Sequence, residues 1–118
     1  MFKINDKVAL TADDIDDLMV AALEGGINYW CEDCLIKKLP GSGELFASHV
    51  ISKNGVLTLF DLESTKKWDL TLEMFLKGVK MYCEENSVDS GEDLMNSHDA
   101  YTADSIIQYA IFDEIIYG

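Results

Sequence analysis

The sequence predicts an α+β fold in which three helices pack on one face of a small, mainly antiparallel sheet of about four strands. Apolar residues recur at helical spacing in three separate segments, and an Asn-Gly pair lies between two β-prone segments. The predicted elements follow the order strand, helix, strands, helix, helix. With 118 residues, 48% of them hydrophobic, and no repeat or linker, the chain is expected to form a single domain over residues 1–118.

The first helix is the clearest element of the sequence, and it follows a strand predicted over residues 2–10. Thr11 and Asp14 have the spacing of a capping box, with aspartate in place of the usual glutamate. The apolar stripe of the helix comprises Ile15, Leu18, Met19, Ala22 and Leu23. Gly25 and Gly26 are expected to end the helix.

A β-hairpin over residues 46–62 is expected at the centre of the chain. Asn54 and Gly55 separate its two arms, and they suit a type I′ turn because both central positions of that turn need a positive φ. A two-residue turn would pair position 50 with position 59. The core face of this hairpin would then carry Val50, Leu57 and Leu59.

A strand, or the lead into one, is expected over residues 27–31 and a further strand over residues 66–70, followed by two helices. The second helix is predicted to start with Thr71 as its cap, and the third to follow Thr102. Their apolar stripes comprise Leu72, Phe75, Leu76, Val79 and Cys83 in the second helix, and Ala103, Ile106, Ile107, Ala110 and Ile111 in the third. Residues 84–98 are polar and lack a regular period, which predicts a long loop, with a turn of helix over residues 92–96 as the alternative for its centre.

The chain is strongly acidic, with 22 acidic side chains against 9 basic ones, all of them lysines, and a formal net charge of −13. Nucleic-acid binding and polybasic membrane contacts both depend on basic side chains, so the composition argues against both. No apolar segment is long enough to span a bilayer, and the first residues lack the apolar core of a signal peptide. A cytoplasmic location is therefore expected.

The acidic residues are unevenly distributed along the chain. Those at positions 13–17 lie at a helix start, where the helix dipole favours negative charge. No lysine follows Lys80, whereas nine acidic residues do: Glu84, Glu85, Asp89, Glu92, Asp93, Asp99, Asp104, Asp113 and Glu114. A surface of one charge sign steers a basic partner toward it. The predicted partner-binding residues are Glu84, Glu85, Asp89, Glu92 and Asp93.

Tyr29 and Trp30 are the other predicted partner-binding residues. Tyrosine and tryptophan dominate the hot spots of protein interfaces. Aromatic side chains in such a place are more often half-buried parts of the core, so the two interpretations compete.

Cys31 and Cys34 have the C-x2-C spacing of half a zinc site. The other soft ligands, Cys83, His49 and His98, stand singly, and no second close pair completes the site. Neither histidine accompanies a recognisable nucleophile motif. The sequence therefore predicts no metal, no cofactor and no catalytic residue.

Two segments of the chain resemble a family of small proteins from phages and prophages of Gram-positive bacteria. The first runs from Asp14-Ile-Asp-Asp17 through Ala22-Leu-Glu-Gly-Gly-Ile-Asn-Tyr-Trp-Cys31, and the second from Ala103-Asp-Ser-Ile-Ile-Gln-Tyr-Ala-Ile-Phe112 to Gly118. The family has no assigned activity, so no functional residue is carried over from it. The resemblance implies a phage accessory protein expressed inside a bacterial host cell.

The sequence favours a non-enzymatic accessory protein that binds a protein partner with a basic surface. A specific form of this hypothesis is an inhibitor of a host nucleic-acid-handling or defence system, in which carboxylates imitate phosphates. One alternative is a self-associating structural or accessory phage protein, a homo-oligomer held by Tyr29, Trp30 and exposed strand edges. Another is a small metal-binding protein that uses Cys31, Cys34 and a histidine.

Overall fold

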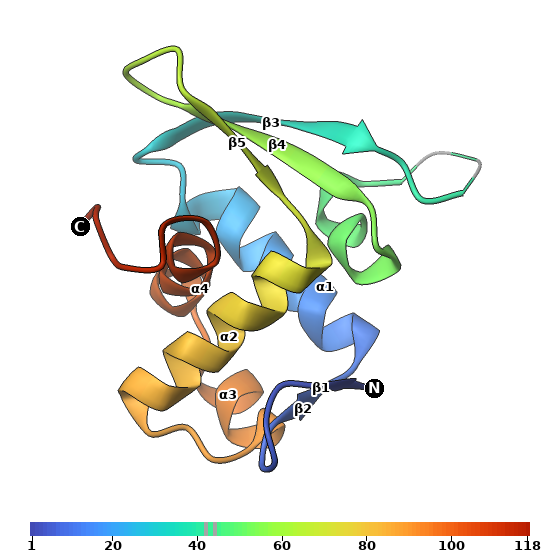
Figure 1. The fold of residues 1–118 in the computed structure, drawn as a ribbon, viewed down its shortest axis with the longest axis vertical. Coiled ribbons are helices and arrows are strands. Elements are labelled where there is room, and N and C mark those ends of the chain that lie inside the picture. Colours follow the sequence, from blue (N-terminus) through green and yellow to red (C-terminus); the bar gives the residue numbers. More distant parts are fainter. Residues whose placement is uncertain (42, 44) are drawn as a thin grey trace.

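The protein has an α+β fold, with helices on one side of a three-stranded antiparallel sheet (Figure 1). The computed structural model describes residues 1–41, 43 and 45–118. Its strands are Phe2–Lys3 (β1), Ala9–Leu10 (β2), Cys31–Lys38 (β3), Val56–Asp61 (β4) and Lys67–Leu70 (β5). Its α-helices are Ala12–Ala21 (α1), Leu72–Asn86 (α2), Gly91–Ser97 (α3) and Ala100–Phe112 (α4). The predicted fold class is confirmed, whereas the predicted numbers of helices and strands are matched only roughly.

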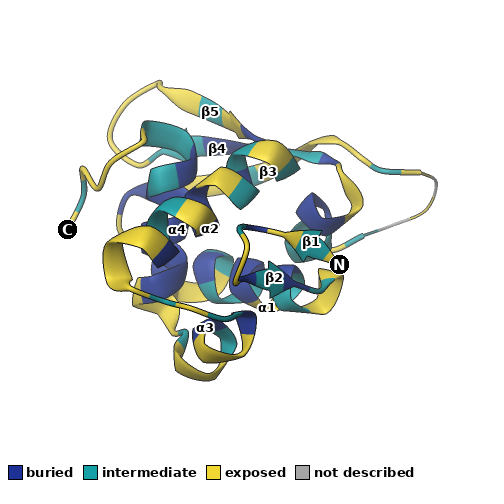
Figure 2. Cartoon of the chain, turned by 60° about the horizontal axis from the view of Figure 1, so that its bottom comes forward, coloured by how far each residue is buried: buried dark blue, intermediate teal, exposed yellow. Residues whose placement is uncertain are grey.

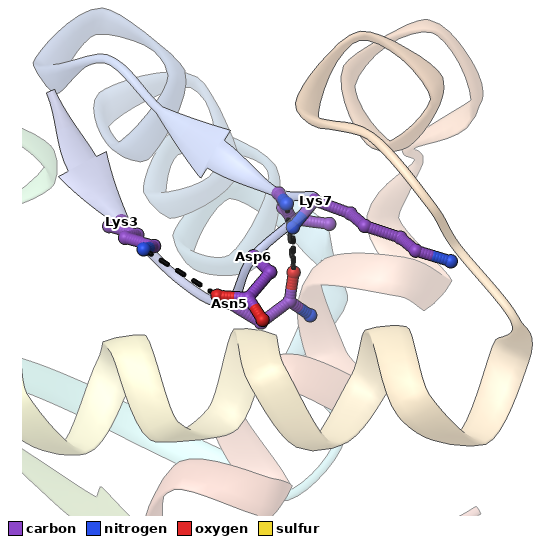
Figure 3. A network of polar contacts seen from close by, with 5 residues as sticks. Lys3, Asn5, Asp6 and Lys7 are labelled. Carbon is purple, nitrogen blue, oxygen red and sulfur yellow. Dashed lines mark hydrogen bonds and ion pairs between the residues drawn. The ribbon is translucent and has the colours of Figure 1, made fainter.

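The N-terminal segment is a short hairpin, so the prediction of one strand over residues 2–10 was wrong. β1 and β2 pair antiparallel across a turn that the side chain of Asn5 holds together. Its Oδ1 atom accepts hydrogen bonds from the backbone N–H groups of Lys7 and Val8, each at 2.8 Å (Figure 3). Asparagine favours turns because its side chain bonds to nearby backbone in this way.

The start of α1 confirms the predicted capping box. Thr11 Oγ1 accepts the backbone N–H of Asp14 at 3.0 Å, and Asp14 Oδ2 accepts the backbone N–H of Thr11 at 2.9 Å. The helical segment ends at Gly26, as predicted, although its last turn, Ala22–Gly26, is a π-helical turn and not a continuation of the α-helix. A Cβ atom on Gly26 would lie 2.6 Å from the carbonyl oxygen of Ala100. This glycine thus permits close contact with the start of α4.

The predicted 46–62 hairpin was wrong in its first arm. Residues Ala47–His49 and Ile51–Lys53 form 3₁₀ turns, and β4 pairs with β3 on one side and β5 on the other. Val50 and Ile51 are both fully buried, and the two consecutive 3₁₀ turns around them place both side chains in the core. Asn54 has a φ of 67°, the positive value that the Asn-Gly pair predicts. It ends the 3₁₀ turn Ile51–Lys53, however, and does not lie in a two-residue hairpin turn.

The other strand predictions fare differently. β5 confirms the strand predicted over residues 66–70. β3 begins only at the last residue of the strand predicted over 27–31, because a turn occupies the residues before it. The three side chains expected on one core face are all buried, namely Val50, Leu57 and Leu59.

The helices of the C-terminal half confirm some of the predictions and correct others. Thr71 caps α2, with its Oγ1 atom 3.2 Å from the Met74 backbone nitrogen. α4 starts earlier than predicted, since Asp99 is its cap and accepts the Thr102 backbone N–H at 2.9 Å. The long loop predicted over residues 84–98 was wrong in its extent, because α2 reaches Asn86, whereas the turn of helix considered over residues 92–96 is present as α3, Gly91–Ser97. Leu94 is the one fully buried apolar side chain of this short helix, too few to give a helical period in the sequence.

The core lies between the inner face of the three-stranded sheet and the helices α1, α2 and α4 (Figure 2). Its largest fully buried side chains are Trp30, Phe75, Leu10, Ile15, Leu18, Met19, Ile27, Ile51, Leu57, Leu59, Leu70 and Leu94. In residues 1–41, 43 and 45–118, no helix covers the opposite face of this sheet (Figure 1). Among the described residues, no helix combines the length and apolar character needed to cross a membrane.

Candidate functional site

The acidic residues predicted to bind a partner lie where α2 ends and α3 begins. Glu84 and Glu85 are exposed in the last turn of α2, and Glu92 and Asp93 are exposed in the first turn of α3. Asp89 lies in the connection between the two helices. We call these five residues the α2–α3 acidic end. The fold therefore brings them to one end of the molecule, beside the β1–β2 hairpin (Figure 1).

The carboxylates of this end differ in their local surroundings. Glu92 and Asp93 start α3, where the helix dipole stabilises negative charge. Glu84 and Glu85 lie at the C-terminus of α2, where the exposed carbonyl groups of the helix disfavour negative charge. The last turn of α2 contains no basic residue. The two glutamates therefore cost α2 some stability, and neither forms an ion pair within 4 Å in the described part of the chain.

Only one of the five carboxylates has a lysine partner in the described part of the chain. Asp89 Oδ1 lies 3.8 Å from Lys7 Nζ, and both side chains are largely exposed. An exposed pair of this kind contributes little to stability. The side chain of Lys7 extends from the turn of the β1–β2 hairpin, next to the Lys3–Asp6 ion pair (Figure 3). An open depression lies between this turn and the end of α2, and Glu84 and Asp89 are among its lining residues.

Trp30 does not belong to an accessible surface, so its prediction as a partner contact was wrong. Its side chain is only 2% exposed. The indole ring is stacked on the ring of Tyr117, with centroids 5.1 Å apart, and meets the rings of Phe112 and Trp68 edge to face. A tryptophan surrounded by aromatic rings in this way is part of the core. Tyr29 is half exposed, and only its outer face is available.

A buried carboxyl group on α4 holds both of these aromatic residues. Asp104 is 5% exposed, and its Oδ1 atom accepts the indole N–H of Trp30 at 2.8 Å and the amide N–H of Gln108 at 3.0 Å. Its Oδ2 atom accepts the hydroxyl of Tyr29 at 2.6 Å. Burial, followed by the hydrogen bond to Asp104, raises the pKa of Tyr29 to about 12. Asp104 therefore has a structural role and does not contribute to the exposed acidity.

Gln108 extends this polar network to the C-terminal segment. Its Oε1 atom accepts the backbone N–H groups of Ile116 and Tyr117, each at 2.9 Å, although the glutamine is fully buried. These bonds fix Tyr117 against Trp30 and hold the C-terminal segment against the core. Sequence reasoning missed Asp104 and Gln108, which the i, i+4 spacing of two polar residues within an apolar helix stripe could have indicated.

The cysteines have the properties of buried thiols. Cys31 and Cys34 lie on β3 and Cys83 on α2, and all three are free. Burial raises the pKa of Cys34 to about 12 and that of Cys83 to about 11, so both remain protonated at neutral pH. In residues 1–41, 43 and 45–118, no three His, Cys, Asp or Glu side chains are grouped closely enough to hold a metal ion. His49 lies against Phe46, and His98 Nδ1 is 2.7 Å from the carbonyl oxygen of Met95.

No protein-family model, no curated protein and no solved structure matches this chain. The resemblance of two segments to a phage and prophage family therefore stays a prediction. Functional inference rests on the geometry and the charge of the chain itself.

Proposed function

We propose that this chain is a non-enzymatic binding protein that engages a protein partner with a basic surface through the α2–α3 acidic end. The observation that carries the proposal is the position of Glu84 and Glu85. Both are exposed at the C-terminus of α2, where the dipole disfavours them, and no lysine nitrogen lies within 4 Å of either in the described residues. Carboxylates that weaken their own helix are better explained by a contact outside the chain than by folding.

Three further features support a partner of basic character. Glu92 and Asp93 continue the acidic surface onto α3, and the acidic block has no lysine after Lys80. The net charge of −13 adds a long-range field that accelerates association with a basic surface. A specific form of the proposal is charge mimicry, in which the carboxylates occupy the phosphate subsites of a host protein that handles nucleic acid.

Affinity capture from a bacterial lysate at low and high salt tests this proposal. The bait would be the wild-type chain, and the first variant would reverse Glu84, Glu85, Glu92 and Asp93 to lysine. The matched control would reverse four exposed acidic residues elsewhere, namely Asp17, Glu24, Glu63 and Glu73. Circular dichroism would verify that both variants keep the fold.

The proposal predicts a captured protein of basic character that is lost in the first variant, retained by the control and released by salt. Competition by DNA or by a nucleic-acid-like polyanion would identify the mimicry form. A partner that binds equally well after reversal of the α2–α3 acidic end would contradict the proposal.

A further inference from the structure

β3 is an open edge of the three-stranded sheet. The strand order is β3-β4-β5, so among the described residues only one side of β3 is paired, and six of its eight residues are exposed. Two of the exposed side chains are apolar, since Leu35 is 54% exposed and Ile36 is 37% exposed. An unpaired strand edge with apolar side chains offers free backbone N–H and C=O groups to another strand. The edge therefore needs either protection or a partner strand.

The charged residues of β3 lie at equal distances on the two sides of Leu35, and their charges are negative on one side and positive on the other. Glu32 and Asp33 precede it by three and two residues, and Lys37 and Lys38 follow it by two and three residues. Reversing the direction of the strand about Leu35 therefore exchanges every acidic position with a basic one. In a chain with 22 acidic and 9 basic side chains, β3 is a segment in which the two signs balance.

We propose that β3 pairs antiparallel with β3 of a second copy of the chain, around a two-fold axis at Leu35. Antiparallel strands related by a two-fold axis form a closed, self-complementary interface and extend the two sheets into one. Within the regular part of β3, residues 33–36, Leu35 then faces its own copy and Cys34 lies opposite Ile36. Beyond the register slips at its two ends, the acidic residues of one copy lie across from the basic residues of the other, with Asp33 nearest Lys37 and Glu32 nearest Lys38. Opposite charges and apolar pairs at directly opposed positions stabilise antiparallel strands.

Protection of the edge is the competing explanation for the same charges. The register of β3 with β4 slips between Cys31 and Asp33 and between Ile36 and Lys38, and bulges and charged residues are both common on protected edges. Protection alone requires charge of either sign and sets no order. The opposite signs at equal distances from Leu35 are what pairing with a second copy requires.

The pair formed by Glu32 and Lys38 gives the cleanest test. Lys37 Nζ already lies 2.6 Å from Asp69 Oδ2 within the chain, so changing Lys37 would also alter the monomer. Glu32 and Lys38 are exposed and form no ion pair in the described part of the structure. Substitutions at these two positions therefore affect the proposed interface and leave the contacts within each chain intact.

Sedimentation velocity over a wide range of protein concentration would compare the wild type with Glu32→Lys, Lys38→Glu and the double variant. The wild type should form a dimer. Each single reversal places like charges opposite each other twice, by symmetry, and should weaken the dimer about tenfold or more. The double variant restores two opposite-charge pairs and should recover dimer formation.

Glu63→Lys is the matched control, because it makes the same charge change at an exposed residue of the β4–β5 connection. Both it and Glu32→Lys reduce the net negative charge, which by itself favours association. Only the proposed register predicts that Glu32→Lys nevertheless dissociates the dimer while Glu63→Lys does not. A wild type that stays monomeric, or a dimer that all variants retain, would overturn the inference. The monomeric outcome would assign the β3 charges to edge protection.

Discussion

At the scale of single residues, Asp104 links more of the structure than any of the residues that the sequence singled out. Its two carboxyl oxygens accept hydrogen bonds from Trp30, Gln108 and Tyr29, and Gln108 in turn holds the C-terminal segment. The donors come from positions far apart in the sequence. Removing the acceptor leaves buried N–H groups without partners, which costs more than the hydrogen bonds themselves contribute.

Asp104→Ala should therefore destabilise the protein by about 3 kcal/mol, as measured by urea unfolding followed by tryptophan fluorescence. Tyr29→Phe is the control, because it removes only the half-exposed donor and keeps both buried ones. It should cost about 1 kcal/mol. Equal and small losses for the two variants would show that the buried network contributes little.

At the scale of elements, the crossing of α2 and α4 depends on a glycine. A Cβ atom at Gly78 would lie 2.4 Å from the carbonyl oxygen of Ile106 and 2.9 Å from the Cβ atom of Ala110. These neighbours are backbone and a small side chain on a packed helix, so they cannot turn aside. The two helices must move apart to admit even one methyl group.

Gly78→Ala should destabilise the fold by about 2 kcal/mol, although alanine is the better helix former. Gly25→Ala is the matched control, since nothing lies within 4 Å of a Cβ atom there. It should leave stability unchanged or increase it by up to about 1 kcal/mol. Thermal unfolding of both variants would measure the difference. If Gly78→Ala were as well tolerated as Gly25→Ala, the close packing of α2 on α4 would be disproved.

Elements with local signals were predictable from the sequence, and those defined by tertiary contacts were not. Thr11 and Asp14 specify a helix start through their own side chains, and the capping box is present. Asn54 signals a positive φ equally well, but the signal does not say which element precedes it. The burial of consecutive Val50 and Ile51 against α1 decides for a 3₁₀ turn, and that contact is not visible in the sequence.

At the scale of the whole molecule, the acidic total divides into separate roles. Asp104 is buried, Asp99 and Asp14 cap helices, and Asp113 pairs with Lys77 at 2.5 Å. Charge counting predicted the acidic C-terminal half but could not separate these roles, because each depends on what the side chain contacts. Of the predicted partner-binding residues, the five of the α2–α3 acidic end and Tyr29 are exposed. Trp30 is buried.

Uncompensated acidity of this kind should make stability depend on salt. The four ion pairs of the described residues are all solvent-exposed, so screening removes little attraction. The same screening weakens the repulsion among the excess carboxylates of a compact chain of net charge −13. Raising sodium chloride from about 0.02 M to about 0.5 M should therefore increase the melting temperature.

The two four-residue charge reversals locate the source of this repulsion, because they change the net charge equally. If the carboxylates of the α2–α3 acidic end repel one another most strongly, reversing Glu84, Glu85, Glu92 and Asp93 should reduce the salt response more than reversing Asp17, Glu24, Glu63 and Glu73. Calorimetric melts of both variants and the wild type at each salt concentration would measure the response. A melting temperature that falls with salt would mean that the exposed ion pairs outweigh the repulsion, and would remove the electrostatic basis for treating this end as a strained, partner-seeking surface.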